Sequence, residues 1–221
     1  MIPHVIIVGA DKGGVGKTFI ARALIDYFRK AGTDLRAIDT QIPAGILQRF
    51  YPDVTEIVDL SRSDGQMHVF DSLRHKVTIV DCQAGSLSPT LKTLAEIGFL
   101  DQLKTGRLKI TILHILGSTQ ASFDEIRAIG AIAEGAKHYL VTNHINGASF
   151  LGLSSEARNV ATGTIDIAKL DELAAEFVDK AGVSFAAFVA NDVNSAVMRG
   201  YIASWEKRVF AAFDAARLGD L

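Results

Sequence analysis

Ten residues between an apolar run and a helical pattern carry the residue types that phosphate binding needs. The segment 9–18 reads Gly-Ala-Asp-Lys-Gly-Gly-Val-Gly-Lys-Thr. Glycines let successive backbone N–H groups turn toward an anion, a lysine reaches the β- and γ-phosphates of a nucleotide, and a hydroxyl binds Mg²⁺. These parts occur in that order, as Gly13, Gly14, Gly16, Lys17 and Thr18. The segment therefore predicts a phosphate-binding loop, although the general motif has glycine where this chain has Asp11.

Two further apolar runs end in aspartate. Val77–Val80 is followed by Asp81, and Leu35–Ile38 by Asp39. The carboxyl ends of parallel strands meet at one edge of a sheet, so Asp81 is expected beside the phosphate loop, where it can hold Mg²⁺ through water. Asn143 ends a third apolar run. Its position alone does not indicate a function, because asparagine is common at strand ends and in turns.

These carboxylates and the loop must be positioned by a sheet with covering helices. Strands are expected at Val5–Val8, Leu35–Ile38, Val77–Val80, Ile110–Leu116 and Tyr139–Thr142, with a weaker one at Thr164–Ile167. Helical patterns cover 17–31, 121–134, 170–181 and 195–217, and another helix begins near Pro89. This alternation predicts one α/β domain over residues 1–221, with a doubly wound, mostly parallel sheet and helices on both faces. The polar segment 53–76 is expected to form loops or a short excursion.

Composition excludes several classes of protein. The chain has 221 residues, of which 48% are hydrophobic and 22% charged, a composition typical of a folded globular domain. Its formal net charge of −2 gives no global reason to expect nucleic-acid binding. One cysteine, Cys82, excludes an intrachain disulfide and a cysteine-based metal site, and six histidines lack metal-site spacing. No apolar run reaches the ~18 residues of a membrane span and no signal peptide opens the sequence, so we expect a cytoplasmic protein.

The segment from Lys12 to Thr18 resembles the deviant Walker A motif of the ParA/MinD family. The segment 81–85, Asp-Cys-Gln-Ala-Gly, resembles the Asp-x-Pro-Ala-Gly switch II sequence of the MinD branch. The resemblance covers residues 4–145 and implies a P-loop ATPase in which Lys12 reaches across a dimer interface to the partner's nucleotide. A cation delivered in this way neutralises charge on the phosphoryl group only when two ATP-loaded subunits meet.

The resemblance also assigns site residues. The implied nucleotide contacts are Asp11, Lys12, Gly13, Gly14, Val15, Gly16, Lys17, Thr18, Phe19 and Asn143, the last beside the adenine. The implied Mg²⁺ site contains Thr18, Asp39 and Asp81. The implied catalytic residues are Lys12, Lys17, Asp39 and Gln41.

One catalytic position departs from the family. The family reads Asp-x-Asp-Pro-Gln where this chain reads Asp-Thr-Gln-Ile-Pro at 39–43. Gln41 therefore replaces the aspartate that the resemblance assigns to the attacking water. A glutamine can orient water but cannot accept its proton. ATP binding is thus better supported than hydrolysis, and the expected activity is a weak ATPase.

Several functions remain open from the sequence. The leading hypothesis is a Mg-ATP-dependent homodimer that partitions or positions DNA or a cellular assembly, with a protein partner that stimulates turnover. Non-specific DNA binding is expected only in the ATP dimer, with Lys104, Arg107 and Lys109 as candidates. The segment 17–21 and Ile38-Asp39-Thr40 also resemble the TraL-type accessory ATPases of conjugative transfer. Two alternatives are an ATP-binding scaffold without turnover and a small-molecule enzyme of the dethiobiotin synthetase kind.

The last helical pattern carries apolar residues four apart. These residues are Val197, Tyr201, Trp205, Val209 and Phe213. Such a stripe packs into a core, lines a partner groove or lies on a membrane. The basic and acidic residues of 183–221 balance, four against four, so anionic lipid is not attracted, and we expect a core stripe and no membrane binding.

Overall fold

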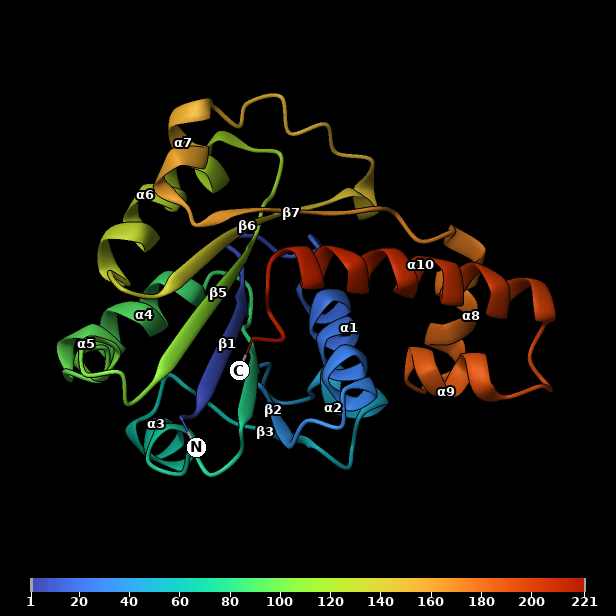
Figure 1. Cartoon of the computed structure of the whole chain (residues 1–221), viewed down its shortest axis with the longest axis horizontal. Helices are drawn as coiled ribbons and strands as arrows, with labels where there is room; N and C mark the ends of the chain where they lie inside the picture. Colours follow the sequence, from blue (N-terminus) through green and yellow to red (C-terminus); the bar gives the residue numbers. More distant parts are fainter. Residues whose placement is uncertain (1, 221) are drawn as a thin grey trace.

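A sheet of seven parallel strands lies at the centre of the protein, for which the computed structural model describes residues 2–220 (Figure 1). The strands are His4–Gly9 (β1), Leu35–Asp39 (β2), Thr55–Ile57 (β3), Val77–Asp81 (β4), Lys109–Ile115 (β5), Lys137–Asn143 (β6) and Gly163–Ile167 (β7). Their order across the sheet is β3-β2-β4-β1-β5-β6-β7. The predicted doubly wound fold is therefore confirmed, and all of the paired strands run parallel.

Helices cover both faces of this sheet. On one face lie Lys17–Lys30 (α1), Ile46–Phe50 (α2), Glu172–Ala181 (α8), Phe185–Ala190 (α9) and Ala196–Ala215 (α10). On the other lie Ser63–Phe70 (α3), Leu87–Glu96 (α4), Asp101–Lys104 (α5), Gln120–Ile132 (α6) and Ser155–Val160 (α7), as Figure 1 shows. A short 3₁₀ turn, His144–Asn146 (η1), follows β6. Because both faces are covered, the central strands are apolar along most of their length rather than alternating.

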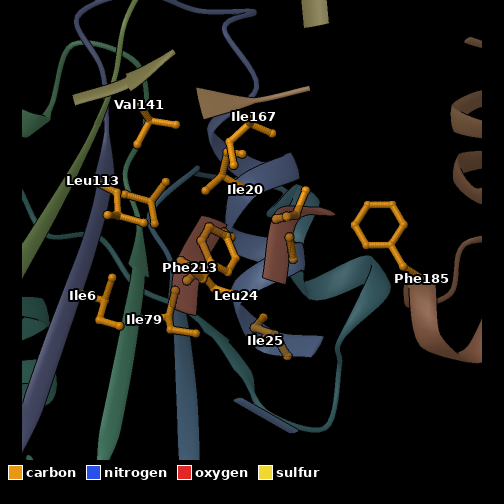
Figure 2. Close-up of a cluster of buried hydrophobic side chains, with 14 of the residues drawn as sticks. Ile6, Ile20, Leu24, Ile25, Ile79, Leu113, Val141, Ile167, Phe185 and Phe213 are labelled. Carbon is orange, nitrogen blue, oxygen red and sulfur yellow. The ribbon is translucent and has the colours of Figure 1, made fainter. Parts of the chain in front are cut away.

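The first helix fixes the phosphate loop to the sheet. Ile20, Leu24 and Ile25 of α1 are fully buried. Figure 2 shows them facing apolar side chains that project from neighbouring strands, with Phe213 of α10 in the same cluster. Burying a side chain of this size stabilises the fold by about 1.5–3 kcal/mol. The start of α1, and with it the loop, is thus held rigidly above the sheet.

The structure differs from the sequence prediction in the segment 53–76. This segment was expected to form loops, but it contains the edge strand β3 and the helix α3. Helix α3 buries only Val69 and Phe70, which are adjacent in sequence, so no helical period is visible there. Helices α2 and α9 were not predicted either, and α4 begins two residues before Pro89.

The prediction that the C-terminal stripe packs into the core is correct for three of its five residues. Trp205, Val209 and Phe213 are buried in the core, and the indole Nε1 of Trp205 donates a hydrogen bond to the carbonyl of Ala168 at 2.7 Å. Val197 and Tyr201 are exposed, because residues spaced four apart drift by about 40° per step around a helix of 3.6 residues per turn. The stripe is therefore mainly a core element. Within residues 2–220 no helix has the length and apolarity to cross a bilayer.

Candidate functional site

A cleft of about 470 Å³ opens at the carboxyl edge of β1, β2 and β4. Its lining is Gly13, Gly14, Gly16, Lys17, Thr18, Phe19, Asp39, Gln41, Ile42, Ile46, Asp81, Cys82, Gln83 and Ala84. Nine of these residues were predicted from the sequence. The cleft lies where the strand order reverses beside β1, the position at which open parallel sheets bind ligands.

The loop that forms one wall of the cleft ends in a helix N-terminus. Gly16 has φ 92° and is the N-cap of α1, and Gly14 has φ 75°. No side chain caps the first turn of α1, so its free N–H groups are available to an anion. The ammonium of Lys17 donates to the carbonyl of Lys12 at 3.1 Å. Burial lowers the pKa of Lys17, an effect that the carboxylate of Asp81 opposes. An anion in the cleft would relieve the same burial penalty.

Two asparagines hold this loop from the side of β6. The amide Nδ2 of Asn143 donates to the carbonyl of Val15 at 3.0 Å, and that of Asn146 donates to the carbonyl of Gly14 at 2.8 Å. The side chain of Val15 is buried in the core, so this residue contributes its backbone rather than its side chain. Asn146 was missed by the sequence analysis, because a contact across 132 residues leaves no local pattern.

The two predicted aspartates lie side by side at the ends of paired strands. Asp39 and Asp81 are register partners between β2 and β4. The carboxylate of Asp39 accepts two backbone N–H groups, from Gln41 at 3.0 Å and from Leu47 at 2.7 Å. By contrast, Oδ1 of Asp81 is buried and has no hydrogen-bond partner. Burial raises the pKa of Asp81 to about 7; the charge of Asp39 adds to this rise, while Thr18 and Lys17 oppose it.

This unpaired oxygen fits a divalent cation. The carboxyl group of Asp81 lies beside Thr18, and its unpaired oxygen needs a positive partner, because burying an unpaired carboxylate is unfavourable. Within residues 2–220 no three histidine, cysteine, aspartate or glutamate side chains group around a point that could hold a metal. Mg²⁺ does not require such a cage, since it is usually held by one or two protein oxygens together with substrate phosphates and water.

A threonine that the sequence analysis did not single out joins the two loops across the cleft. The hydroxyl of Thr40 donates to the carbonyl of Asp81 at 3.2 Å and accepts the backbone N–H of Gln83 at 2.7 Å. Gln41, the next residue, is exposed at the cleft together with Ile42. The loop after β2 and the loop after β4 are thus fastened to each other.

Four predicted nucleotide contacts lie outside the lining: Val15, Asn143, Asp11 and Lys12. Asp11 is half-buried and Lys12 is exposed, and neither lines the cleft. The side chain of Lys12 is therefore free to contact a second molecule, and only its carbonyl serves its own loop, by accepting Lys17.

A second hollow of about 250 Å³ adjoins the first. Phe19 lines both, and Asn143 and Ile145 line the second together with residues of the segment 169–176. Because Asn143 Nδ2 is bonded to the loop, its Oδ1 is left to accept a donor from a ligand. The structure thus brings Asn143 to the site, but into this hollow rather than into the main cleft.

Comparison with solved structures shows the same fold at low sequence identity. The septum site-determining protein MinD of Pyrococcus horikoshii OT3, solved with Mg-ADP, aligns with a TM-score of 0.59 and 14% identity over 99% of this chain and 98% of its own. A ParA family ATPase of Chlorobium tepidum TLS aligns with a TM-score of 0.53 and 14% identity over 91% and 98% of the two chains.

Sequence comparison gives a partial relative and a family. Protein MobD of Acidithiobacillus ferrooxidans is 26% identical over 89 residues, which are 38% of this chain and 39% of MobD. The chain thus matches well under half of the length of that relative. The family model described as the CobQ/CobB/MinD/ParA nucleotide binding domain matches residues 6–211. The protein therefore belongs to the CobQ/CobB/MinD/ParA family of nucleotide-binding domains, and its likeness to the ParA/MinD branch is confirmed.

Proposed function

We propose that the whole chain acts as one Mg-ATP-binding domain that dimerises when ATP is bound and dissociates after slow hydrolysis. The observation that carries the proposal is the cleft itself, where Lys17, the uncapped first turn of α1 and the unpaired oxygen of Asp81 face a common space. Phosphates would contact the first two groups, and Thr18 with Asp81 would hold Mg²⁺. The bound metal would supply charge neutralisation at the phosphates.

The second hollow supports adenine as the base. The free Oδ1 of Asn143 accepts hydrogen bonds, as the 6-amino group of adenine requires, whereas guanine presents a carbonyl at that position. Phe19 at the junction of the two hollows offers an apolar surface to the nucleoside. We therefore expect ATP to bind more tightly than GTP.

The exposed Lys12 supports the dimer. Its ammonium has no place in its own cleft, and a neighbouring subunit docked over the cleft would receive it near the phosphates. Exposed Ile42 and Ile46 at the same rim provide apolar surface for that contact. Dimerisation would then depend on the nucleotide, because two lysines facing empty clefts repel each other.

We propose that the dimer serves to partition or position DNA or a cellular assembly. A protein partner that stimulates turnover fits a weak ATPase with Gln41 in place of a base. Lys104, Arg107 and Lys109 lie around the amino end of β5, at the edge of the sheet opposite the cleft. Dimerisation through the cleft would separate these cations rather than gather them, so they do not support DNA binding by the dimer.

A TraL-like accessory ATPase of conjugative transfer and a non-hydrolysing scaffold share the same nucleotide site. Gln41 favours the scaffold, since the residue at the expected base position cannot accept a proton. Release of phosphate from Mg-ATP distinguishes the scaffold from the ATPase. A small-molecule enzyme on this fold is disfavoured by Lys12, which such an enzyme does not need.

Calorimetry with a lysine variant tests the nucleotide site. Lys17→Ala should abolish Mg-ATP binding, because only backbone donors remain for the β- and γ-phosphates. Lys30→Ala, at the exposed other end of the same helix, is the matched control and should bind like wild type. An unchanged dissociation constant for Lys17→Ala would remove the assignment of the cleft.

A further inference from the structure

A cavity of about 670 Å³ is lined by residues of α1, α9 and α10, which lie on one face of the sheet (Figure 1). It shares no lining residue with the nucleotide cleft or with the hollow beside that cleft. Its walls carry two carboxylates, three cations and an aromatic ring, which are Asp26, Glu206, Arg29, Lys30, Lys207 and Phe210. Pockets for small molecules measure about 300–1,000 Å³, so this cavity has room for one.

Asp26 of α1 places a carboxylate deep in this cavity. It is only 3% exposed, yet it belongs to the lining. Its Oδ2 accepts the hydroxyl of Tyr51 at 2.8 Å and the backbone N–H of Ala186 at 3.3 Å. In the part of the chain that the structure describes, both of these hydrogen bonds end on the same oxygen. Oδ1 is therefore left for a donor that enters the cavity, and such a donor would offset the cost of burying the carboxylate.

Glu206 of α10 presents a second carboxylate to the same space. It is half-buried, and among residues 2–220 it accepts no hydrogen bond and forms no ion pair. Burial raises the pKa of Glu206 to about 7; the charge of Asp26 adds to this rise, whereas Lys30 opposes it. A cation placed between the two carboxylates would relieve both the burial penalty and their mutual repulsion.

The positive groups of the lining lie at the mouth of the cavity. Lys30 and Lys207 are exposed and form no ion pair within the described residues, whereas Arg29 is paired with Asp53. The ammonium of Lys30 lies 5.4 Å from the centroid of the Phe210 ring. The cavity thus has negative groups inside, free cations at its mouth and an aromatic ring beside them. A ligand that complements this layout carries a cation at one end and an anion at the other.

We infer that this cavity binds a small zwitterion in which an aliphatic stem separates an ammonium or guanidinium group from a carboxylate. The cationic group pairs with Oδ1 of Asp26 and with Glu206, the stem contacts Phe210, and the carboxylate reaches Lys30 and Lys207. A ligand without net charge fits, because the two carboxylates of the lining balance its two free lysines. The inference does not depend on the proposed nucleotide site, because the two sites share no residue.

Calorimetry on the nucleotide-free chain tests the inference with matched probes. The zwitterions are ε-aminohexanoate, which carries an ammonium, and γ-guanidinobutyrate, which carries a guanidinium. Hexanoate lacks the cation, and hexylamine lacks the carboxylate. Wild type should bind one of the zwitterions at least about tenfold more tightly than it binds hexanoate or hexylamine, because each missing group forfeits charge-assisted hydrogen bonds.

Variants of the lining locate the bound zwitterion. Asp26→Asn should weaken its binding at least about tenfold, and Glu206→Gln, which serves where Asp26→Asn does not fold, at least about threefold. Lys207→Met should weaken binding of the zwitterion but not of hexylamine. Glu134→Gln, exposed beyond the end of α6 on the other face of the sheet, is the control and should bind like wild type.

The pH dependence of binding gives a second readout. Glu206 must lose its proton to pair with a cation, so binding to wild type should tighten as the pH rises from about 6 to about 8. This dependence should be weaker in Glu206→Gln. Failure of both zwitterions to bind wild type would overturn the inference, as would binding that neither Asp26→Asn nor Glu206→Gln weakens. Hexylamine binding as tight as that of the zwitterions would also overturn it.

Discussion

Substitution of Gly16 by alanine tests the architecture of the phosphate loop against a matched neighbour. Gly14 and Gly16 both have positive φ, at 75° and 92°. A Cβ at Gly14 would meet no atom within 4 Å, whereas one at Gly16 would lie 2.3 Å from the Nδ2 of Asn143. The two variants therefore share the backbone penalty, and only Gly16→Ala adds a clash.

The magnitudes follow from these contacts. Placing alanine in the left-handed region costs about 1–2 kcal/mol of unfolding free energy at either position. At Gly16, Asn143 must also move and give up its hydrogen bond to the carbonyl of Val15. Leaving such buried groups unpaired costs about 1–3 kcal/mol more. We expect Gly16→Ala to lose about 2–5 kcal/mol and Gly14→Ala about 1–2 kcal/mol.

Urea unfolding of five chains measures the difference: wild type, each single glycine variant, Asn143→Ala, and Gly16→Ala combined with Asn143→Ala. Asn143→Ala alone supplies the reference for the double variant. Once Asn143 is truncated the clash is gone, so Gly16→Ala should then cost only about 1–2 kcal/mol, like Gly14→Ala. Two results would refute the role assigned to Asn143. One is an equal loss of unfolding free energy in Gly14→Ala and Gly16→Ala; the other is the same loss from Gly16→Ala whether residue 143 is asparagine or alanine.

Three further predictions concern dimerisation, catalysis and pH. Lys12→Ala should keep Mg-ATP affinity within about tenfold but suppress the dimer seen by sedimentation with a slowly hydrolysed ATP analogue; dimers like those of wild type would make Lys12 a bystander. Gln41→Asp should raise the phosphate-release rate at least about tenfold at saturating ATP, because a positioned base contributes about 10²–10⁴-fold; a rate at or below wild type with dimers intact would contradict this. Burial, with the charges of Lys109 and Lys137, lowers the pKa of His4 from 6.5 to about 4, so the unfolded chain binds a proton that the folded chain does not in that range. Unfolding free energy should therefore fall as pH drops from 6.5 toward 4, by at most about 1.4 kcal/mol per pH unit from this group, and less steeply in His4→Gln; parallel curves would argue against it.

The parts of the site that could be predicted from the sequence are those whose functional residues lie close together in the chain or at the end of a single strand. The glycines, Lys17 and Thr18 follow one another in the chain, so their order alone identifies the loop. Asp81 was predictable because a continuous apolar run, buried on both faces, must be a central strand and its end must lie at the carboxyl edge. Each of these inferences needs one segment and one rule of sheet geometry.

The parts that were missed depend on contacts between distant segments. Helix α9 is six residues long, too short for a helical period, and is stabilised by burial of Phe185 and Phe188. Asn146 reaches Gly14, and Glu125 reaches Ser88 across 37 residues. An asparagine in a turn or a glutamate on a helix is common on any surface. Only packing distinguishes these residues from their solvated equivalents.

The two aspartates illustrate the same limit within a recognised motif. By position, Asp39 and Asp81 are equivalent strand-end carboxylates, and both were assigned to the metal. Their partners make them different: Asp39 is bonded to the backbone of Gln41 and Leu47, whereas Asp81 keeps a buried oxygen without a partner. A carboxylate that already accepts two N–H groups has less capacity for a cation or its water. The carboxylate of Asp39 therefore mainly holds the loop that carries Gln41 and the start of α2 in place. Thr40 fastens the same loop to Asp81, so the loop can move only if these hydrogen bonds break.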